Sequence, residues 1–217
     1  MSEPIVFGRR NSAYVRVVRL ALEEKGVPYR LTEVDVFAPG GPPTGYLERH
    51  PFGRIPAFEH DGYRLYESGA ISRYVDEAFP GPALQPTDPK ARARVNQIIS
   101  VVDSYAYRTM VWDIFVERAR TRERYGREPD EARIAAALLK AQVCMNALED
   151  LMGKDPWLAG SALTLADLHA APIFAYFRMT PEGAGLLARH TGLQRWWDSI
   201  AARPSMAATT IMIEQKP

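Results

Sequence analysis

The chain has 217 residues, of which 47% are hydrophobic and 24% charged, so it is long enough to bury one large core or two small ones. A formal net charge of +1 excludes the strongly basic surface that nucleic acids or acidic membranes attract. The N-terminus lacks a basic-then-apolar signal segment and no apolar run could cross a bilayer, so we expect a cytoplasmic protein with no membrane or nucleic-acid partner.

Cysteine and histidine usage argues against a metal site. The single cysteine, Cys144, allows neither an internal disulfide nor a thiolate cluster, and its apolar helical surroundings predict a buried side chain. No metal-ligand spacing relates the histidines, which are His50, His60, His169 and His190. We therefore expect no metal.

The first predicted elements are a strand, a helix and a strand. "PIVFG" predicts a strand, and "SAYVRVVRLALEEKG" predicts a helix that Ser12 caps and Gly26 ends. One face of this helix carries Val15, Val18 and Leu22. The next strand is expected in "YRLTEVDV", residues 29–36, and the short links indicate a right-handed parallel βαβ unit.

A hairpin and a second helix follow. "PAFEH" and "YRLY" predict two strands joined by Asp-Gly, which suits the two positive φ values of a type I′ turn. "SGAISRYVDEAF" predicts a helix opened by Ser68. The order βαβ then ββα, with Pro56 opening the third strand, indicates a thioredoxin-like arrangement.

A change of pattern near residue 80 indicates a second domain. "PGPALQPTDP" has prolines at 80, 82, 86 and 89, and the sequence after it is helical almost throughout. We expect an α/β thioredoxin-like N-terminal domain at 1–80, a linker at 81–89 and an all-α C-terminal helical bundle domain at 90–217. In that bundle "TLADL" predicts a capping box between Thr164 and Asp167, and Trp196 and Trp197 are expected in the core.

The start of the first helix is the leading place for chemistry. Free N–H groups and the helix dipole favour an anion there. A redox thioredoxin-like protein would carry Cys-x-x-Cys at this point, whereas this chain has "NSAY". Ser12 could donate a hydrogen bond to a thiolate brought by a ligand, or it could be an ordinary N-cap.

Pro56 also allows two interpretations. Proline lacks an N–H and is tolerated only at the first residue of a strand, at an edge or at a bulge. It either marks the start of the strand or forms a cis bond with Ile55 that turns the Ile55 backbone outward to pair with an extended ligand.

Four stretches together resemble one family. "SAYVRVVRLALEEKG" resembles the first helix of serine-type glutathione transferases, "HPFGRIPAF" their Asn-Pro-Phe-Gly-x-Val-Pro-Ala-Leu loop, and "LYESGAISRYV" their Glu-Ser-x-Ala-Ile stretch. "WLAGSALTLADLHAAP" is similar to their Leu-x-Gly-x-x-x-x-x-Ala-Asp segment. The four occur in the family's order over most of the chain, which is thus identified as a member of the cytosolic glutathione S-transferase family of the bacterial phi/theta-like type.

The resemblance implies roles for five residues. Ser12 is the expected catalytic residue, with glutathione as co-substrate. Pro56 is expected to be cis, with the backbone of Ile55 pairing with the cysteinyl part of glutathione. Ser68 would bind the γ-glutamyl carboxylate and Glu67 the ammonium, their alternative roles being a helix cap and a solvated acid.

The chain departs from the family at the glycyl end of glutathione. Arg54 replaces a common glutamine or lysine. "APGGPPTGY" replaces the histidine- or lysine-bearing segment with which many relatives hold the glycyl carboxylate. The candidates to compensate are Arg54, Arg9 and Arg10.

The resemblance further implies a pocket for the electrophile along the helix containing "SYAYRTMVWDIFVERA". Its candidate residues are Asp103, Tyr107, Val111 and Ile114, together with Phe37 from the loop after the second strand. At helical spacing such a stripe is more often part of the core than the wall of a pocket.

The leading interpretation is an enzyme that ionises glutathione for attack on a small hydrophobic electrophile, as a homodimer acting in detoxification. Phe52 either inserts into the neighbouring subunit or packs within its own. A glutathione-dependent isomerase or dehalogenase is an alternative, although "NSAYVRVVR" lacks the Ser-Ser-Cys-Ser run of the isomerases. The other alternative is a non-catalytic, transferase-like interaction module, which would not need Ser12, Pro56, Glu67 and Ser68 together.

Overall fold

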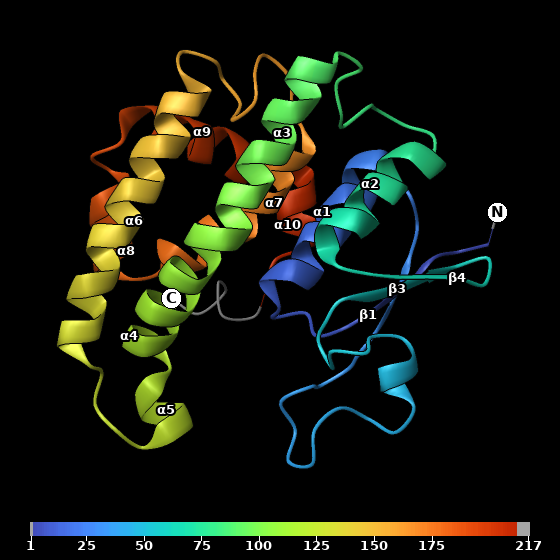
Figure 1. Ribbon diagram of the computed structural model, residues 1–217, viewed down its shortest axis with the longest axis horizontal. Coiled ribbons are helices and arrows are strands. Elements are labelled where there is room, and N and C mark those ends of the chain that lie inside the picture. The colour runs from blue at the N-terminus through green and yellow to red at the C-terminus, as the bar shows by residue number, and fades with distance from the viewer. Residues whose placement is uncertain (1, 212–217) are drawn as a thin grey trace. The chain divides into compact units, whose positions relative to one another are not determined.

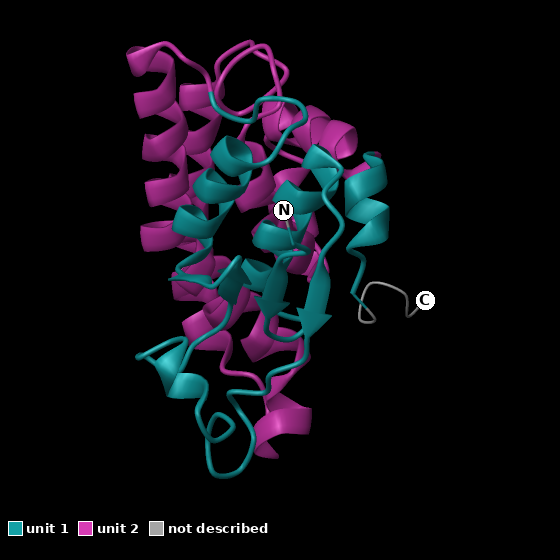
Figure 2. Cartoon of the chain, turned by 90° about the vertical axis from the view of Figure 1, so that its right-hand side faces the viewer, with its two compact units in different colours: residues 1–85, 203–217 teal, residues 86–202 magenta. Residues whose placement is uncertain are grey.

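The computed structural model describes residues 2–211, which form two compact units (Figures 1 and 2). Unit 1 takes in residues 1–85 together with 203–217, and unit 2 is the continuous segment 86–202. The predicted linker, 81–89, contains the change of unit after residue 85. Among the described residues no helix is both long and apolar enough to cross a membrane.

Unit 1 contains a mixed four-stranded sheet in the order β2-β1-β3-β4. Its elements are β1 (Ile5–Phe7), α1 (Ala13–Lys25), β2 (Arg30–Thr32), the 3-10 turn η1 (Tyr46–Glu48), β3 (Ala57–His60), β4 (Tyr63–Tyr66), α2 (Ser68–Ala78) and α10 (Pro204–Ala208). β1 runs parallel to β2 and antiparallel to β3, and β3 runs antiparallel to β4. This confirms the predicted thioredoxin-like arrangement.

The local signals around α1 and the hairpin are confirmed. Ser12 caps α1, and Gly26 follows it with a left-handed φ of 67°. The predicted apolar face of α1 is fully buried, at Val15, Val18 and Leu22. In the hairpin, Asp61 and Gly62 have φ values of 49° and 78°, as a type I′ turn requires.

The second strand is shorter than predicted. The expected strand was 29–36, whereas β2 covers only Arg30–Thr32. β2 lies at the sheet edge with β1 as its one neighbour, and pairing stops where β1 stops, at Phe7 opposite Thr32. The apolar residues after Thr32 instead pack from a loop, where Val34 is buried against Tyr46 and Ala57.

Unit 2 is helical. Its elements are α3 (Pro89–Val101), η2 (Val102–Val116), α4 (Glu117–Ala119), α5 (Thr121–Tyr125), α6 (Glu131–Met152), α7 (Leu165–Phe177), α8 (Pro181–Leu187) and α9 (Thr191–Ala201). α3 continues directly into η2, whose hydrogen bonding is π-helical, so its turns are wider than the α-helical turns that the sequence predicted. α7 is buried along its whole length and packs against α3, η2 and α9.

The predicted core features of unit 2 are confirmed. Thr164 and Asp167 form the capping box at the start of α7. The Asp167 carboxylate also accepts hydrogen bonds from the Leu158 N–H at 2.8 Å and from Trp196 Nε1 at 2.9 Å. Cys144 is buried, and burial raises the pKa of its thiol to about 11, which makes it a poor nucleophile.

Unit 1 also contains α10, which packs against α1. Two buried arginines of α1 reach its last carbonyls. Arg16 Nη2 donates to the Met206 carbonyl at 3.1 Å, and Arg19 Nη2 donates to the Ala208 carbonyl at 3.3 Å. These bonds satisfy carbonyls that the end of a helix leaves without partners.

Candidate active site

β1 and β4 end, and β3 begins, at one row of paired residues across the sheet. This row locates the candidate site. Phe7 of β1 pairs with Ala57 of β3, which pairs in turn with Tyr66 of β4. The residues just beyond the row, at the same edge of the sheet, are Gly8, Pro56 and Glu67. The topology therefore brings together the chain leading into α1, the loop before β3 and the start of α2, all within unit 1.

Ser12 lies at this edge as the N-cap of α1. Its hydroxyl oxygen accepts a hydrogen bond from the Val15 N–H at 3.3 Å. A hydroxyl can accept and donate at once, so its proton remains available to a ligand. The cap and the thiol donor, which the sequence posed as alternatives, are therefore compatible, and the half-buried Ser12 can serve as both.

Gly8 allows the loop before β3 to approach α1, a role that the sequence analysis missed. A Cβ at Gly8, whose φ is 157°, would lie 2.4 Å from Val15 Cγ2 and 3.2 Å from Ile55 Cβ. Val15 is fully buried and has no room to move away. Only a glycine at position 8 thus allows Ile55 to lie so close to the first turn of α1. The sequence signal that could have indicated this role was a glycine between a predicted strand and a predicted helix.

The Ile55–Pro56 bond is cis, as the resemblance implies. Within residues 2–211, the N–H and C=O of Ile55 make no backbone hydrogen bond. Both are therefore free to pair with an extended ligand in the manner of an added strand.

Glu67 and Ser68 stand at the start of α2. Glu67 occupies the N-cap position with φ 70° and ψ 113°, and its side chain makes no capping bond. Ser68 is the first residue of the helix and is not its cap, which corrects the expectation that it opens the helix as an N-cap. Ser68 is 7% exposed. It lies beside the free N–H groups in the first turn of α2, where the carboxylate of a ligand is favoured.

His50 is a second residue of this region that sequence analysis did not assign. It stands where the family motif has asparagine, is 2% exposed, and its ring lies 4.9 Å from that of Tyr66. Burial lowers the pKa of His50, although the nearby Glu67 opposes this. Among the described residues its Nδ1 has no hydrogen-bond partner.

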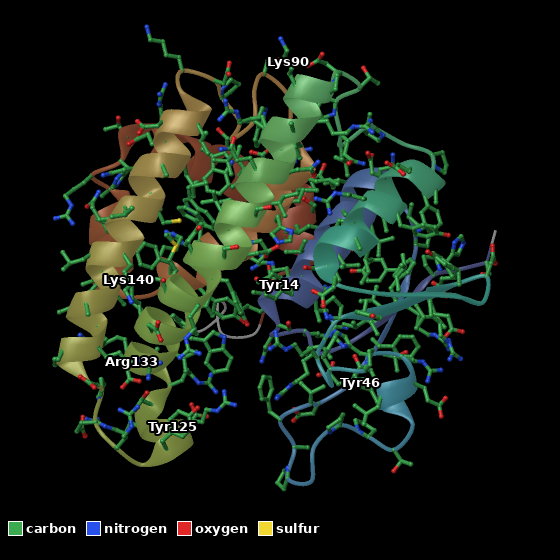
Figure 3. All side chains as sticks on the ribbon, viewed as in Figure 1. Tyr14, Tyr46, Lys90, Tyr125, Arg133 and Lys140 are labelled. Atoms are coloured by element: carbon green, nitrogen blue, oxygen red, sulfur yellow. The ribbon has the colours of Figure 1, made fainter. Side chains whose placement is uncertain are left out.

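The three arginine candidates for the glycyl carboxylate differ in their surroundings. Arg9 is already paired with Asp35 at 3.1 Å. Arg10 lines a separate cavity of about 580 Å³ beside Tyr29. Arg54 is exposed and forms no ion pair with the described residues, while its carbonyl accepts a hydrogen bond from Tyr46 Oη at 2.8 Å (Figure 3 labels Tyr46). Arg54 is thus the candidate whose guanidinium is available.

The electrophile candidates lie in both units. In unit 1, Phe37 is 55% exposed, and its N–H donates to the Asp35 carboxylate at 2.9 Å. In unit 2, Ile114 and Val111 are buried, Tyr107 is half-buried and Asp103 is exposed. Only the Asp103 end of the predicted stripe is thus readily open to solvent.

No metal site accompanies these residues. Across the described part of the chain, no group of three or more His, Cys, Asp and Glu side chains could hold a metal ion.

Comparisons with known proteins point to one family. The model described as "Glutathione S-transferase, N-terminal domain" matches residues 6–83, and that for the C-terminal domain matches residues 101–204. Glutathione S-transferase F13 of Arabidopsis thaliana is 30% identical over 203 residues, which cover 92% of this chain and 91% of the relative. Glutathione S-transferase 3 of Zea mays is 28% identical, with 93% and 91% covered.

Solved structures agree. A theta class glutathione S-transferase from Xanthomonas axonopodis pv. citri, with glutathione bound, is 28% identical, has a TM-score of 0.81 and covers 98% of this chain and 99% of its own. Glutathione S-transferase I from maize, in complex with an atrazine glutathione conjugate, is 25% identical with a TM-score of 0.83, and 96% of each chain is covered.

Proposed function

The chain belongs to the glutathione S-transferase family and is a glutathione transferase, and we propose that it binds glutathione at the sheet edge described above, with Ser12 activating the thiol. The observation that carries this proposal is the register of the three strands, which brings Ser12, Ile55 and the start of α2 to one edge.

The groups at this edge match the chemistry of glutathione. The tripeptide carries a γ-glutamyl ammonium and carboxylate, a central thiol and a glycyl carboxylate. Ile55 offers a free backbone N–H and C=O to the cysteinyl part. Ser68 and the first turn of α2 can bind the γ-glutamyl carboxylate, and Glu67 can bind the ammonium group. Arg54 can bind the glycyl carboxylate.

Ser12 would act on the thiol through its hydroxyl proton. A thiol with an ordinary pKa near about 8.5 is mostly protonated at neutral pH. A hydroxyl donor and the positive end of the α1 dipole both stabilise the thiolate, which should lower this pKa by roughly one unit or more. The thiol releases its proton to solvent, and the thiolate attacks the electrophilic carbon. The C–S bond forms, and a leaving group such as chloride departs with the electron pair of the broken bond.

The test compares Ser12→Ala with Ser12→Thr, which keeps a hydroxyl and a capping oxygen. We expect the absorbance of the bound thiolate to titrate about one pKa unit higher in Ser12→Ala, with turnover of a chromogenic aryl halide about tenfold lower at neutral pH. Ser12→Thr should fall between this variant and the unmodified enzyme. An unchanged thiol pKa in Ser12→Ala would remove Ser12 from the mechanism.

We further infer that the enzyme is a homodimer. The family resemblance supports this, and the 70% exposure of Phe52 suits a residue that a partner covers. Sedimentation at micromolar concentration tests the dimer, because a species of 24.3 kDa would contradict it. The expected cytoplasmic location stays a prediction for cell fractionation.

A further inference from the structure

We propose that the cavity beside Tyr29 in unit 1 binds a short peptide with free termini, its carboxylate at Arg10 and its ammonium group at Glu3 and Glu23. The cavity has a volume of about 580 Å³, which is in the range of small-molecule sites, and all its lining residues belong to unit 1. Ser12 is not among those lining residues. The inference is therefore independent of the proposed function.

The topology of the βαβ unit separates the charges of the cavity into two ends. β1 and β2 run parallel, so α1, which joins the end of β1 to the start of β2, runs in the opposite direction. Arg10 lies between β1 and α1, whereas Glu3 precedes β1 and Glu23 lies in the last turn of α1. The cavity thus has a guanidinium group at one end and two carboxylates at the other.

Arg10 is the cation of the cavity that a ligand can use. It is exposed and forms no hydrogen bond or ion pair with residues 2–211. The other lining arginine, Arg19, is 3% exposed and donates to Tyr29 Oη and to the carbonyls of Ala208 and Thr209. Because these bonds occupy the Arg19 guanidinium, a ligand carboxylate would be bound by Arg10.

The acidic end of the cavity is held in place by hydrogen bonds. Arg19 Nε donates to Tyr29 Oη at 3.0 Å, and Tyr29 Oη donates to Glu23 Oε1 at 3.1 Å. Burial raises the pKa of Tyr29, so its hydroxyl keeps the proton that it donates. Within the described part of the chain, Glu23 Oε2 and the Glu3 carboxylate accept no hydrogen bond. Both can therefore accept from an ammonium group.

The distance between the two ends suits a peptide of about three residues. With a rise of about 1.5 Å per residue along α1, the backbones of Arg10 and Glu23 are roughly 15–20 Å apart. An extended tripeptide spans about 10 Å. The long side chains of Arg10 and Glu23 cover the remaining distance from either end.

Leu31, which lines the cavity, offers backbone groups to such a peptide. β2 is an edge strand, and β1 is its one neighbour in the described sheet. The Arg30 N–H donates to the Pro4 carbonyl at 3.0 Å. The Thr32 carbonyl accepts from the Gly8 N–H at 2.9 Å. Because the residues on either side of Leu31 turn their groups to β1, the N–H and C=O of Leu31 point away from β1. A peptide in the proposed orientation runs parallel to β2 and pairs with these groups.

The test compares peptides that lack one charged terminus. The probes are trialanine, N-acetyl-trialanine, which has no ammonium group, and trialanine amide, which has no carboxylate. Saturation-transfer NMR measures the Kd of each. We expect trialanine to bind with a Kd of roughly 1 mM or below, and each blocked peptide to bind about three- to fivefold more weakly. An excess of S-hexylglutathione should leave the Kd of trialanine unchanged.

Variants assign each terminus to its partner. Arg10→Gln should weaken trialanine about three- to fivefold but leave trialanine amide unaffected, because the amide has no charge for Arg10 to bind. Glu3→Gln should weaken trialanine but leave N-acetyl-trialanine unaffected. Thermal melts check that both variants are folded. Arg64→Gln is the matched control, since Arg64 is an arginine of β4 at the opposite edge of the sheet.

Three results would overturn this proposal. Displacement of trialanine by S-hexylglutathione would assign the peptide to the candidate active site. Equal affinity for the free and blocked peptides would show that the termini are not recognised. An effect of Arg10→Gln no larger than that of Arg64→Gln would exclude the proposed carboxylate site. The proposed function stands in each case, because the Ser12 variants test it separately.

Discussion

Glu67 has a backbone conformation that few residues with a side chain adopt. Its φ of 70° carries a cost of about 1–3 kcal/mol, and such strain concentrates at functional sites. The positive φ of Asp61 is explained by its hairpin turn, whereas Glu67 lies between a strand and a helix. Its conformation places a carboxylate beside the N-terminus of α2, where we propose the γ-glutamyl group binds.

Ser68 separates ligand binding from stability. Removing its hydroxyl in Ser68→Ala should cost about 1.5–3 kcal/mol of glutathione binding, or about ten- to a hundredfold in affinity, because a bond to a charged group is lost. The melting temperature should change little, since Ser68 is not the cap of α2. Calorimetric titration of glutathione and thermal melts measure the two quantities.

Ser72, one turn further along α2, is the matched control for this prediction. It is 2% exposed, and its hydroxyl has no hydrogen-bond partner among the described residues. Ser72→Ala should therefore leave the affinity unchanged. If Ser68→Ala lowers the melting temperature while its affinity stays within twofold, Ser68 is structural.

Among the elements, the junction of α4, α5 and α6 depends on one buried carboxylate. Glu117 accepts two bonds from Arg127, at 2.6 and 2.9 Å, one from Arg133 at 3.2 Å and one from the Asp130 N–H at 2.8 Å. Figure 3 shows Tyr125 and Arg133 at this end of unit 2. The arginines hold the pKa of Glu117 at about 2, although burial opposes this.

This junction should be sensitive to acid. A carboxyl pKa lowered from 4.5 to about 2 contributes stability that is fully present above about pH 4.5 and is lost as the pH falls through about 2. Glu117→Gln should lose roughly 3 kcal/mol of unfolding free energy at pH 7, and the difference from the unmodified protein should narrow below pH 4. Urea unfolding at pH 7, 4 and 3 checks this. A difference that stays constant over these values would contradict the role of ionisation.

Local sequence signals predicted the secondary-structure elements well. The features that these signals could not predict depend on contacts between residues far apart in the chain. Ser12 and Gly26 fixed the ends of α1 because capping depends on neighbours in the chain. The length of β2 depends on where β1 ends. The His169–Asp103 pair joins residues 66 apart, and no local pattern relates them.

At the scale of the whole chain, unit 1 is assembled from both ends of the sequence. Arg203 donates two bonds of 2.6 Å to Glu24 of α1, and Ser205 donates another. Burial would raise the pKa of Glu24, but these donors outweigh it and the pKa is lowered. The start of α10 therefore stabilises α1, the helix that positions Ser12.

Arg203→Ala should lower the free energy of unfolding by about 2–3 kcal/mol, because Glu24 stays buried but loses its arginine donor. The loss is smaller than for a fully buried ion pair, because Arg203 is partly exposed. Glu24→Gln with Arg203→Ala should cost less than the sum of the single changes, since they share one interaction. Thermal and urea unfolding measure this, with the exposed Arg195→Ala on α9 as control. Additive losses would mean that the pair is not coupled.

Unit 1 is built from two segments that lie on either side of unit 2 in the sequence, and this has a consequence for folding during synthesis. A ribosome delivers the chain from the N-terminus, and domains commonly fold in that order as they emerge. Here the continuous segment 86–202 is complete before α10 is made. Until then the guanidinium groups of Arg16 and Arg19 lack the carbonyls that they bind in the finished molecule. The helical unit is thus the first to be complete on the nascent chain, and the unit that carries Ser12 lacks these contacts until α10 has emerged.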